Sequence, residues 1–192
     1  MLINTFDGRA YYPQSISIQN NMSKNKLLAT EIVAKYHPTY RRNADRKANL
    51  LKNPDHYKLT YLVEQAMASV GSHKFVDGHH YDLSDYSEIK TASIRMAPST
   101  KGGCSFAGEI TGVTGASGNE KIGPIRLVVY NPHTSSLMYY MLPKDVWSQK
   151  ITRHPTSGVG KVTYTYNSNT DAIAKFEDYR VKSFRQLALA KA

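Results

Sequence analysis

The feature that most constrains the fold is an apolar run in the second half of the chain. Residues 125–130 read Ile-Arg-Leu-Val-Val-Tyr, which is nearly all apolar, as in a central strand that is buried on both faces. After the turn signal at 131–134, a second apolar run at 137–142 predicts the hairpin partner of that strand. A strand that is buried on both faces requires other segments of the chain to pack against both sides of its sheet. The sequence therefore predicts an α/β or α+β fold with helices flanking a mixed sheet.

Periodic apolar residues predict the helices. Over residues 59–70 the apolar side chains recur at i, i+3, i+4 and i+7, which indicates an amphipathic helix that Gly71 should end as its C′ residue. An earlier helix is expected to begin at Ser23, a suitable N-cap, and to run to about Tyr36. Pro38 should prevent its continuation, because the residue before a proline disfavours helical geometry.

The remaining elements complete one domain. Residues 105–114 and 159–166 predict strands, and Pro143 is suited to the first turn of a short helix. No internal repeat or linker divides the chain, so a single domain over 1–192 is expected. Its expected parts are an N-terminal arm at 1–22, a basic helical part at 23–71, a β-rich core at 72–166 and an amphipathic C-terminal helix at 176–190.

Charge and cysteine content exclude several classes of protein. The 192 residues include 25 Lys and Arg against 15 Asp and Glu, a net charge of +10, which predicts a polyanionic partner such as nucleic acid. The single cysteine, Cys104, excludes an internal disulfide and a cysteine-based zinc site. The sequence contains neither an apolar run of membrane-spanning length nor a signal peptide, so we expect a cytoplasmic protein with no membrane partner.

The most basic segment lies at residues 39–58, which contain six lysines and arginines with Tyr40 and Tyr57 interspersed. One interpretation is a solvated helical face or loop. The other is a surface that contacts phosphates or grips a nucleic-acid strand. The sequence leaves both open.

A dense cluster of charge that includes three acids lies at residues 80–91, which we expect to form a strand, a short turn and a second strand. Glu88 and Lys90 flank the apolar Ile89, and residues two apart in a strand point to the same face. Burial of Ile89 would hold Glu88 and Lys90 side by side on an outward face. Asp82 and Asp85 lie just upstream, so a divalent metal is expected to use these charges.

Two carboxylates and a backbone carbonyl form a hard oxygen site that suits Mg²⁺. Asp82, Glu88 and the carbonyl of Ile89 supply that set, and Lys90 is placed to orient or deprotonate water or to stabilise phosphate oxygens. The chemistry expected from this combination is hydrolysis of a phosphodiester.

Asp82 followed by Glu88-Ile89-Lys90 resembles the PD-(D/E)xK motif of restriction-endonuclease-like nucleases, in the compact arrangement of methyl-directed mismatch-repair nickases. Those proteins also carry a glutamate on the preceding helix, and Glu64 in Leu62-Val63-Glu64 lies on such a helix here. The resemblance covers roughly residues 59–95. It implies a restriction-endonuclease-like core, Mg²⁺ as cofactor, and catalytic roles for Glu64, Asp82, Glu88 and Lys90.

Some assignments stay open. No proline precedes Asp82, and Asp85 is a second candidate for the first metal ligand; Asp82 is preferred because Asp85 falls in the expected turn. Arg95 and Lys101 are the basic residues best placed to meet DNA, with surface solubility as the alternative. Three histidines near the motif are metal ligands or polar turn residues: His73, His79 and His80.

The function expected from the sequence is that of a type II restriction endonuclease, which hydrolyses double-stranded DNA at a specific site. A homodimer is expected because two-fold symmetry matches a palindromic site. The alternatives are a repair or structure-specific nickase or endonuclease with the same centre, and a non-catalytic basic DNA-binding protein.

Overall fold

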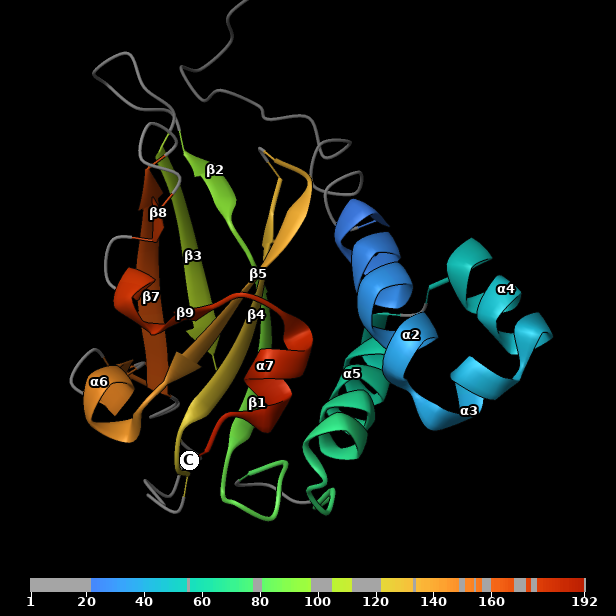
Figure 1. Cartoon of the computed structure of the whole chain (residues 1–192). Helices are drawn as coiled ribbons and strands as arrows, with labels where there is room; N and C mark the ends of the chain where they lie inside the picture. Colours follow the sequence, from blue (N-terminus) through green and yellow to red (C-terminus); the bar gives the residue numbers. More distant parts are fainter. Residues whose placement is uncertain are drawn as a thin grey trace, which may run out of the picture.

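The chain forms three layers in the computed structural model (Figure 1): a group of helices, a mixed four-stranded sheet and a second, antiparallel sheet. The residues that the structure describes are 22–54, 56–77, 81–97, 105–111, 122–132, 134–148, 151–153, 155–156, 160–167, 172–173 and 176–191. The expected N-terminal arm therefore lies outside them, except for Met22. Helices flanking a mixed sheet confirm the predicted class, which is α+β.

The first sheet has the strand order β1-β4-β5-β9. Its strands are β1 (Glu88–Ser93), β4 (Ile125–Asn131), β5 (Ser136–Leu142) and β9 (Arg180–Val181). β1 runs parallel to β4, whereas β5 is antiparallel to both of its neighbours. Every residue of β4 is buried, which confirms the predicted central strand and its hairpin partner.

The second sheet was not expected as a separate layer. It is antiparallel, in the order β2-β3-β7-β6, with β8 also paired to β7. Its strands are β2 (Arg95–Ala97), β3 (Ser105–Thr111), β6 (Ile151–Arg153), β7 (Gly160–Asn167) and β8 (Ala172–Ile173). β3 and β7 confirm the predicted strands at 105–114, as far as Thr111, and at 159–166.

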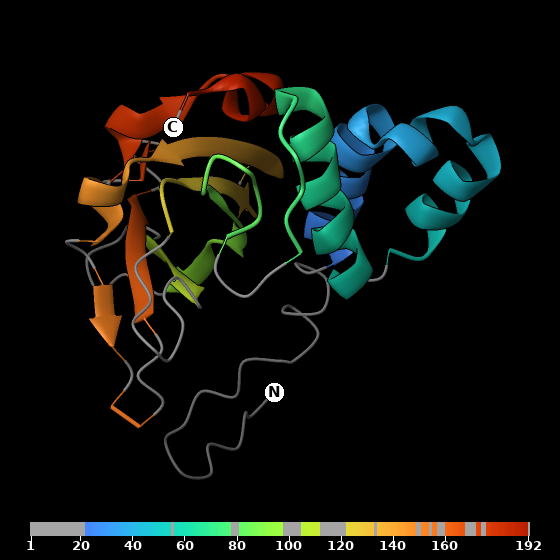
Figure 2. The ribbon, with the colours of Figure 1, turned by 90° about the horizontal axis from the view of Figure 1, so that it is seen from below.

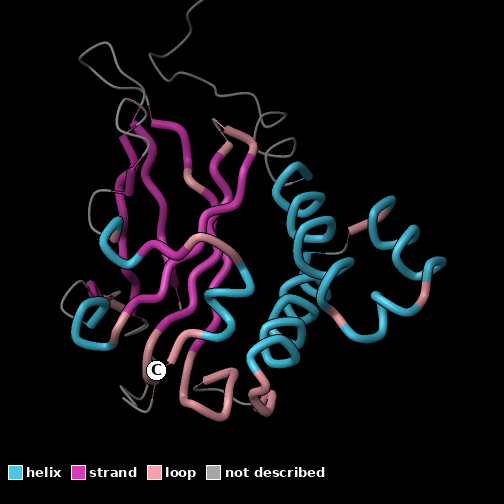
Figure 3. Tube along the Cα trace, in the orientation of Figure 1, coloured by secondary structure: helices cyan, strands magenta, loops and turns pink. Residues whose placement is uncertain are grey.

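Most helices lie on the outer face of the first sheet (Figure 3). Residues 22–27 are helical and continue into the π-helix η1 and then α2, which ends before the extended residue His37, as predicted. The elements are η1 (Leu28–Val33), α2 (Ala34–Tyr36), α3 (Pro38–Arg42), α4 (Ala44–Lys52), α5 (His56–Gly71), α6 (Lys144–Ser148), η2 (Glu177–Tyr179) and α7 (Phe184–Leu189). Within the described residues, no helix combines the length and apolar character needed to cross a membrane.

Two hydrophobic cores lie on opposite faces of β4, because successive side chains of a strand alternate between faces. Leu127 and Val129 belong to the core that also holds Trp147. Val128 belongs to the other core, which η1, α5 and α7 cover and which includes Ile89. The layered cover on both sides explains why β4 tolerates almost no polar residue.

The prediction of one helix over 176–190 is wrong. Phe176 is buried in the core that holds Trp147, whereas Phe184 is buried in the core beneath α5. A single straight helix cannot place both rings on opposite faces of the sheet, so the chain crosses the sheet edge as η2 and β9. Ser183 then caps α7, accepting a hydrogen bond from the Gln186 N–H at 3.1 Å.

Gly71 does not have the predicted C′ role at the end of α5. The left-handed residue is Ser72, with φ of 56°, and the His73 N–H donates to the Ala68 carbonyl at 3.0 Å, as in a Schellman motif. Gly71 is needed for a different reason. A Cβ at this position would lie 2.3 Å from the Ala188 carbonyl oxygen, so the missing side chain lets α5 approach α7.

Arg126 of β4 joins the first sheet to α7 and to the turn before β1. Its side chain is 0% exposed and donates to the carbonyl oxygens of Leu187 and Ala190. It also donates to Asp85 Oδ2 at 2.6 Å and to Ser87 Oγ at 3.2 Å. Every one of these acceptors compensates a charge that would be costly to bury alone.

Replacing Arg126 should therefore destabilise the fold strongly. Arg126→Met leaves the Asp85 carboxylate and two carbonyls without their donor, and we expect a loss of about 3–5 kcal/mol in the free energy of unfolding. Urea denaturation measures this loss. The matched control Arg185→Met removes an exposed arginine from α7 and should change stability by less than about 0.5 kcal/mol. Equal losses in the two variants would contradict the bridging role of Arg126.

Candidate active site

The chain before β1 forms a compact turn, not the predicted first strand. The N–H groups of Asp82 and Leu83 both donate to the Ser87 carbonyl, at 3.0 and 3.2 Å, and the Tyr86 N–H donates to the Leu83 carbonyl. Leu83 forms an isolated bridge with Phe75, and its neighbours bond to the same segment: the Val76 N–H donates to the Asp82 carbonyl and the Ser84 N–H donates to the Lys74 carbonyl, both at 2.9 Å. The backbone groups of residues 82–87 are therefore satisfied partly within the turn and partly by residues 74–76 and Gly123, and no continuous strand precedes β1.

Tyr86 completes this turn in a left-handed conformation, with φ of 65°, which is unusual for a bulky residue. The Gly123 N–H donates to its carbonyl at 2.7 Å and holds it there. The ring is 55% exposed and packs edge-on against Tyr81, with ring centroids 5.1 Å apart. The turn thus presents two tyrosines beside Asp82.

β1 places Glu88 and Lys90 together, as predicted. Ile89 is 2% exposed and packs in the core beneath α5, and the Lys90 Nζ contacts Glu88 Oε1 as an ion pair. The Ile89 N–H also donates to Asp82 Oδ2 at 2.7 Å, which brings the turn carboxylate to the same strand. The prediction that Glu88 lies on an outward face is wrong, because Glu88 is buried and only 8% of its surface is exposed.

Glu64 of α5 interacts electrostatically with Asp82, Glu88 and Lys90. Burial raises the pKa of Glu64 to about 8, and the negative charges of Asp82, Glu88 and Asp77 add to that effect while Lys90 opposes it. The helix before the motif therefore contributes a carboxyl group to the cluster that Asp82, Glu88 and Lys90 form. We call these four residues the acidic centre.

Burial is also the main cause of the pKa shifts of the other two carboxyl groups of the acidic centre. It raises the pKa of Glu88 to about 7, against the attraction of Lys90, and the charge of Asp82 raises it further. Burial likewise raises the pKa of Asp82, although the Ile89 N–H and Lys90 oppose the shift. Three carboxyl groups face one ammonium, so the ionised acidic centre lacks positive charge.

A divalent cation would supply that missing charge, and carboxylate oxygens are the ligands that Mg²⁺ prefers. Asp82 and Glu88 offer such oxygens from adjacent backbone segments. Among the described residues, however, no three His, Cys, Asp or Glu side chains are arranged as a ready-made metal site. The donor chemistry fits Mg²⁺ with two protein carboxylates, leaving positions for water and substrate.

Asp85 faces a different environment from Asp82. Burial alone would raise the pKa of Asp85, but hydrogen bonds from Ser87 and Arg126 and the charge of Arg126 outweigh it and hold that pKa below its usual value. His73 Nε2 lies 3.6 Å from Asp85 Oδ2. Asp85 thus belongs to the Arg126 cluster, and the geometry favours Asp82 as the partner of Glu88.

Several predicted site residues are not placed by the structure. Lys101, His79 and His80 lie outside the described residues, as does Cys104. Arg95 opens β2, but its side chain is not described.

Arg126 is the residue that sequence reasoning missed. Its signal was present, because one arginine interrupts an otherwise apolar run that was predicted to be buried on both faces. A buried arginine requires an acidic partner, and the structure supplies Asp85, about forty residues earlier in the chain.

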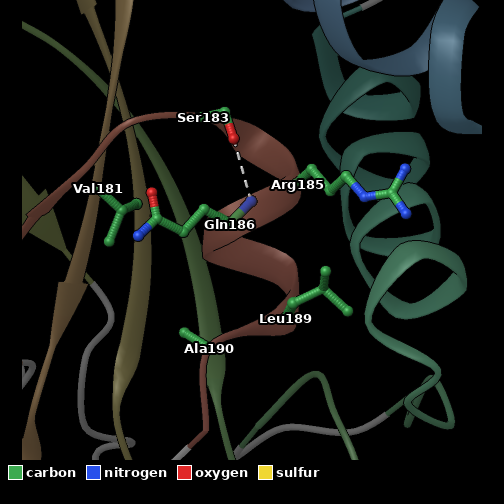
Figure 4. Close-up of a pocket in the computed structure, with 6 residues that line it drawn as sticks. All are labelled: Val181, Ser183, Arg185, Gln186, Leu189 and Ala190. Atoms are coloured by element: carbon green, nitrogen blue, oxygen red, sulfur yellow. Dashed lines mark hydrogen bonds between the residues drawn. The ribbon is translucent and has the colours of Figure 1, made fainter.

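An open groove of about 440 Å³ lies elsewhere, between β9 and α7 (Figure 4). None of the acidic centre lines it. Its lining residues are Val181, Ser183, Arg185, Gln186, Leu189 and Ala190.

The raised pKa of Glu64 makes stability depend on pH. Below about pH 4.5 the carboxyl is protonated in both states; as pH rises towards 8 the unfolded chain ionises first, so the folded state loses stability. Glu64→Gln should remove this loss and stabilise the metal-free protein by roughly 1–2 kcal/mol more at about pH 8.5 than at pH 5, allowing for solvent screening. Urea denaturation in EDTA at both values measures the difference.

The control for this measurement is Glu177→Gln, which neutralises an exposed carboxylate paired with Arg180. It should show almost no difference between the two pH values. A pH-independent effect of Glu64→Gln would contradict the raised pKa.

Comparison with known proteins gives no relative from which to transfer a function. No protein-family model matches the sequence, and no curated protein matches it significantly. The site and its chemistry therefore have to be argued from this chain alone.

Proposed function

We propose that the protein is a Mg²⁺-dependent endonuclease of the PD-(D/E)xK type, with a restriction-endonuclease-like core, that hydrolyses double-stranded DNA at a specific sequence. The observation that carries the proposal is the convergence of the acidic centre from three separate elements: α5 provides Glu64, the turn provides Asp82, and β1 provides Glu88 and Lys90. Charged groups with shifted pKa values that gather in one place are typical of catalytic sites.

Asp82, Glu88 and the carbonyl of Ile89 would hold Mg²⁺ in this proposal. The bound ion would activate water near neutral pH and compensate charge on the phosphate. Its charge would also favour the ionised forms of Asp82 and Glu88, whose buried carboxyl groups otherwise retain protons.

Lys90 has the role of orienting the attacking water and stabilising the phosphate oxygens. Its ion pair with Glu88 fixes the ammonium beside the metal-binding carboxylate, which limits the reorganisation needed on substrate binding. Glu64 supports the acidic centre from α5, where it is placed to hold or release a proton near neutral pH.

Duplex DNA is the substrate that the charge balance favours. The net charge of +10 provides general attraction for a polyanion, and Arg95 and Lys101 are the proposed contacts close to the motif. A homodimer would allow both strands of a palindromic site to be cut, whereas a monomer would nick one strand.

Cleavage of supercoiled plasmid tests the proposed reaction. The wild-type protein with Mg²⁺ should give discrete linear or nicked products, and EDTA should abolish them. Lys90→Ala should lower the rate by about 10²–10³-fold, because it removes charge stabilisation at the reacting phosphate. Ragged products would favour a nuclease without sequence reading. Duplex binding without cleavage in Mg²⁺ or Mn²⁺ would refute the enzymatic proposal.

The two aspartates should respond differently in the same assay. Asp82→Asn should abolish cleavage, a loss of at least about 10³-fold, because it removes a proposed metal ligand. It should not lower stability, because burial already disfavours the ionised form of the Asp82 carboxyl group. Asp85→Asn should lower stability through Arg126 and leave the rate per folded molecule within a few-fold of wild type. Urea denaturation run beside the cleavage assay separates the two effects. The reverse pattern would assign the metal ligand to Asp85.

A further inference from the structure

A helical lobe, residues 38–52, extends away from both sheets beyond α5. It consists of α3 and α4, which lie on the far side of α5 in Figure 1 and again in the perpendicular view of Figure 2. Its role is not explained by the acidic centre, which lies on α5, the turn and β1.

The lobe concentrates positive charge. The lobe contains five cations and one acid, Asp45, so its 15 residues carry a net charge of +4, out of the net charge of +10 of the whole chain. The cations are Arg41, Arg42, Arg46, Lys47 and Lys52, and all five are exposed. No ion pair found among the described residues involves any of them.

Little of the lobe serves the hydrophobic core. Residues 41–49 are all exposed, and Leu50 is the only residue of the lobe that is buried. The helix dipoles explain basic residues in a last turn, such as Arg42 and Lys52, at about 0.3–1 kcal/mol each. They do not explain Arg46 and Lys47, which lie in the first half of α4. The lobe therefore holds more exposed charge than its folding requires.

The lobe is fixed to the helix that carries Glu64. His37, the residue before α3, is buried and its Nε2 lies 2.9 Å from Oε1 of Gln65 on α5. Gln65 follows Glu64 directly, so neighbouring residues of one helix support the lobe and the acidic centre. Their side chains diverge by about 100° around the helix axis.

We infer that the lobe is a separate docking surface for the phosphate backbone of duplex DNA. Exposed arginines that lack acidic partners bind phosphates well, because each contact releases condensed counterions. The inference rests on the proposed function in naming DNA as the ligand, but it assigns binding to residues outside the reacting centre. The lobe contributes affinity, and the acidic centre contributes chemistry.

Duplex binding in EDTA tests the inference without cleavage. Fluorescence anisotropy on a duplex of about 30 base pairs compares the wild type with a lobe variant, Arg41→Ala/Arg42→Ala/Arg46→Ala, over a range of salt concentrations. The lobe variant should bind at least about tenfold more weakly, and the slope of log affinity against log salt should fall by roughly 2–3.

A charge-matched control removes three exposed cations at the other end of the described chain: Lys182→Ala/Arg185→Ala/Lys191→Ala. It should stay within about threefold of wild type at every salt concentration. Circular dichroism and urea denaturation check that both variants remain folded, which is expected because all six side chains are exposed.

The outcomes separate this inference from the proposed nuclease. Equal losses in the lobe and control variants, or no binding of duplex by the wild type, would overturn the docking surface. Failure of the nuclease proposal appears instead as absence of cleavage in Mg²⁺, which the EDTA binding assay does not involve. With DNA at saturating concentration, the lobe variant should cleave within about twofold of the wild-type rate.

Discussion

The ion pair between the buried Arg126 and the half-buried Asp85 anchors the turn before β1 to the rest of the fold. A buried guanidinium is tolerated only when its donors are satisfied, and here Asp85, Ser87 and the carbonyls of α7 accept them. The same contacts join β4, the turn before β1 and the C-terminal helix. Asp82 lies in the same turn, three residues before Asp85, and its own hydrogen bond from the Ile89 N–H holds it beside β1.

The turn places Asp82 and Asp85 in different surroundings, although both were candidates for the first metal ligand in the sequence. Asp85 accepts the charge of Arg126 and its pKa is lowered, whereas Asp82 lies near Glu88 and Glu64 and its pKa is raised. An acid that stabilises the fold needs a permanent cationic partner. An acid that binds an exchangeable cation must lack one. The opposite shifts follow from burial and from the partners of each group, and the proposed function assigns the structural role to Asp85 and metal binding to Asp82.

Local sequence patterns correctly predicted the elements that pack against the same hydrophobic cores from one end to the other. α5 and the β4–β5 hairpin are such cases: the helical period of apolar residues predicts the buried face of α5, and a continuous apolar run predicts that β4 is buried on both faces. Phe176 and Phe184 have spacing compatible with a helix, yet they pack on opposite faces of a sheet that the local sequence cannot reveal. The choice between Asp82 and Asp85 likewise depended on Arg126, about forty residues away. The candidate residues were thus predictable, but their division into two clusters was not.

The electrostatics of the acidic centre explain why a second binding surface is useful. Before a metal binds, the acidic centre contains a single ammonium, that of Lys90, which is paired with Glu88, so the centre offers a phosphate little net positive charge. In the proposed function, much of the affinity for DNA then comes from cations outside that centre, those of the lobe and the proposed contacts Arg95 and Lys101. The lobe meets this need because α5 supports it from Gln65 while Glu64 turns towards the acidic centre. Further positive charge within the centre, beyond Lys90, would instead compete with the proposed Mg²⁺ for the same carboxylates. Separation of binding from chemistry is therefore the arrangement that allows both.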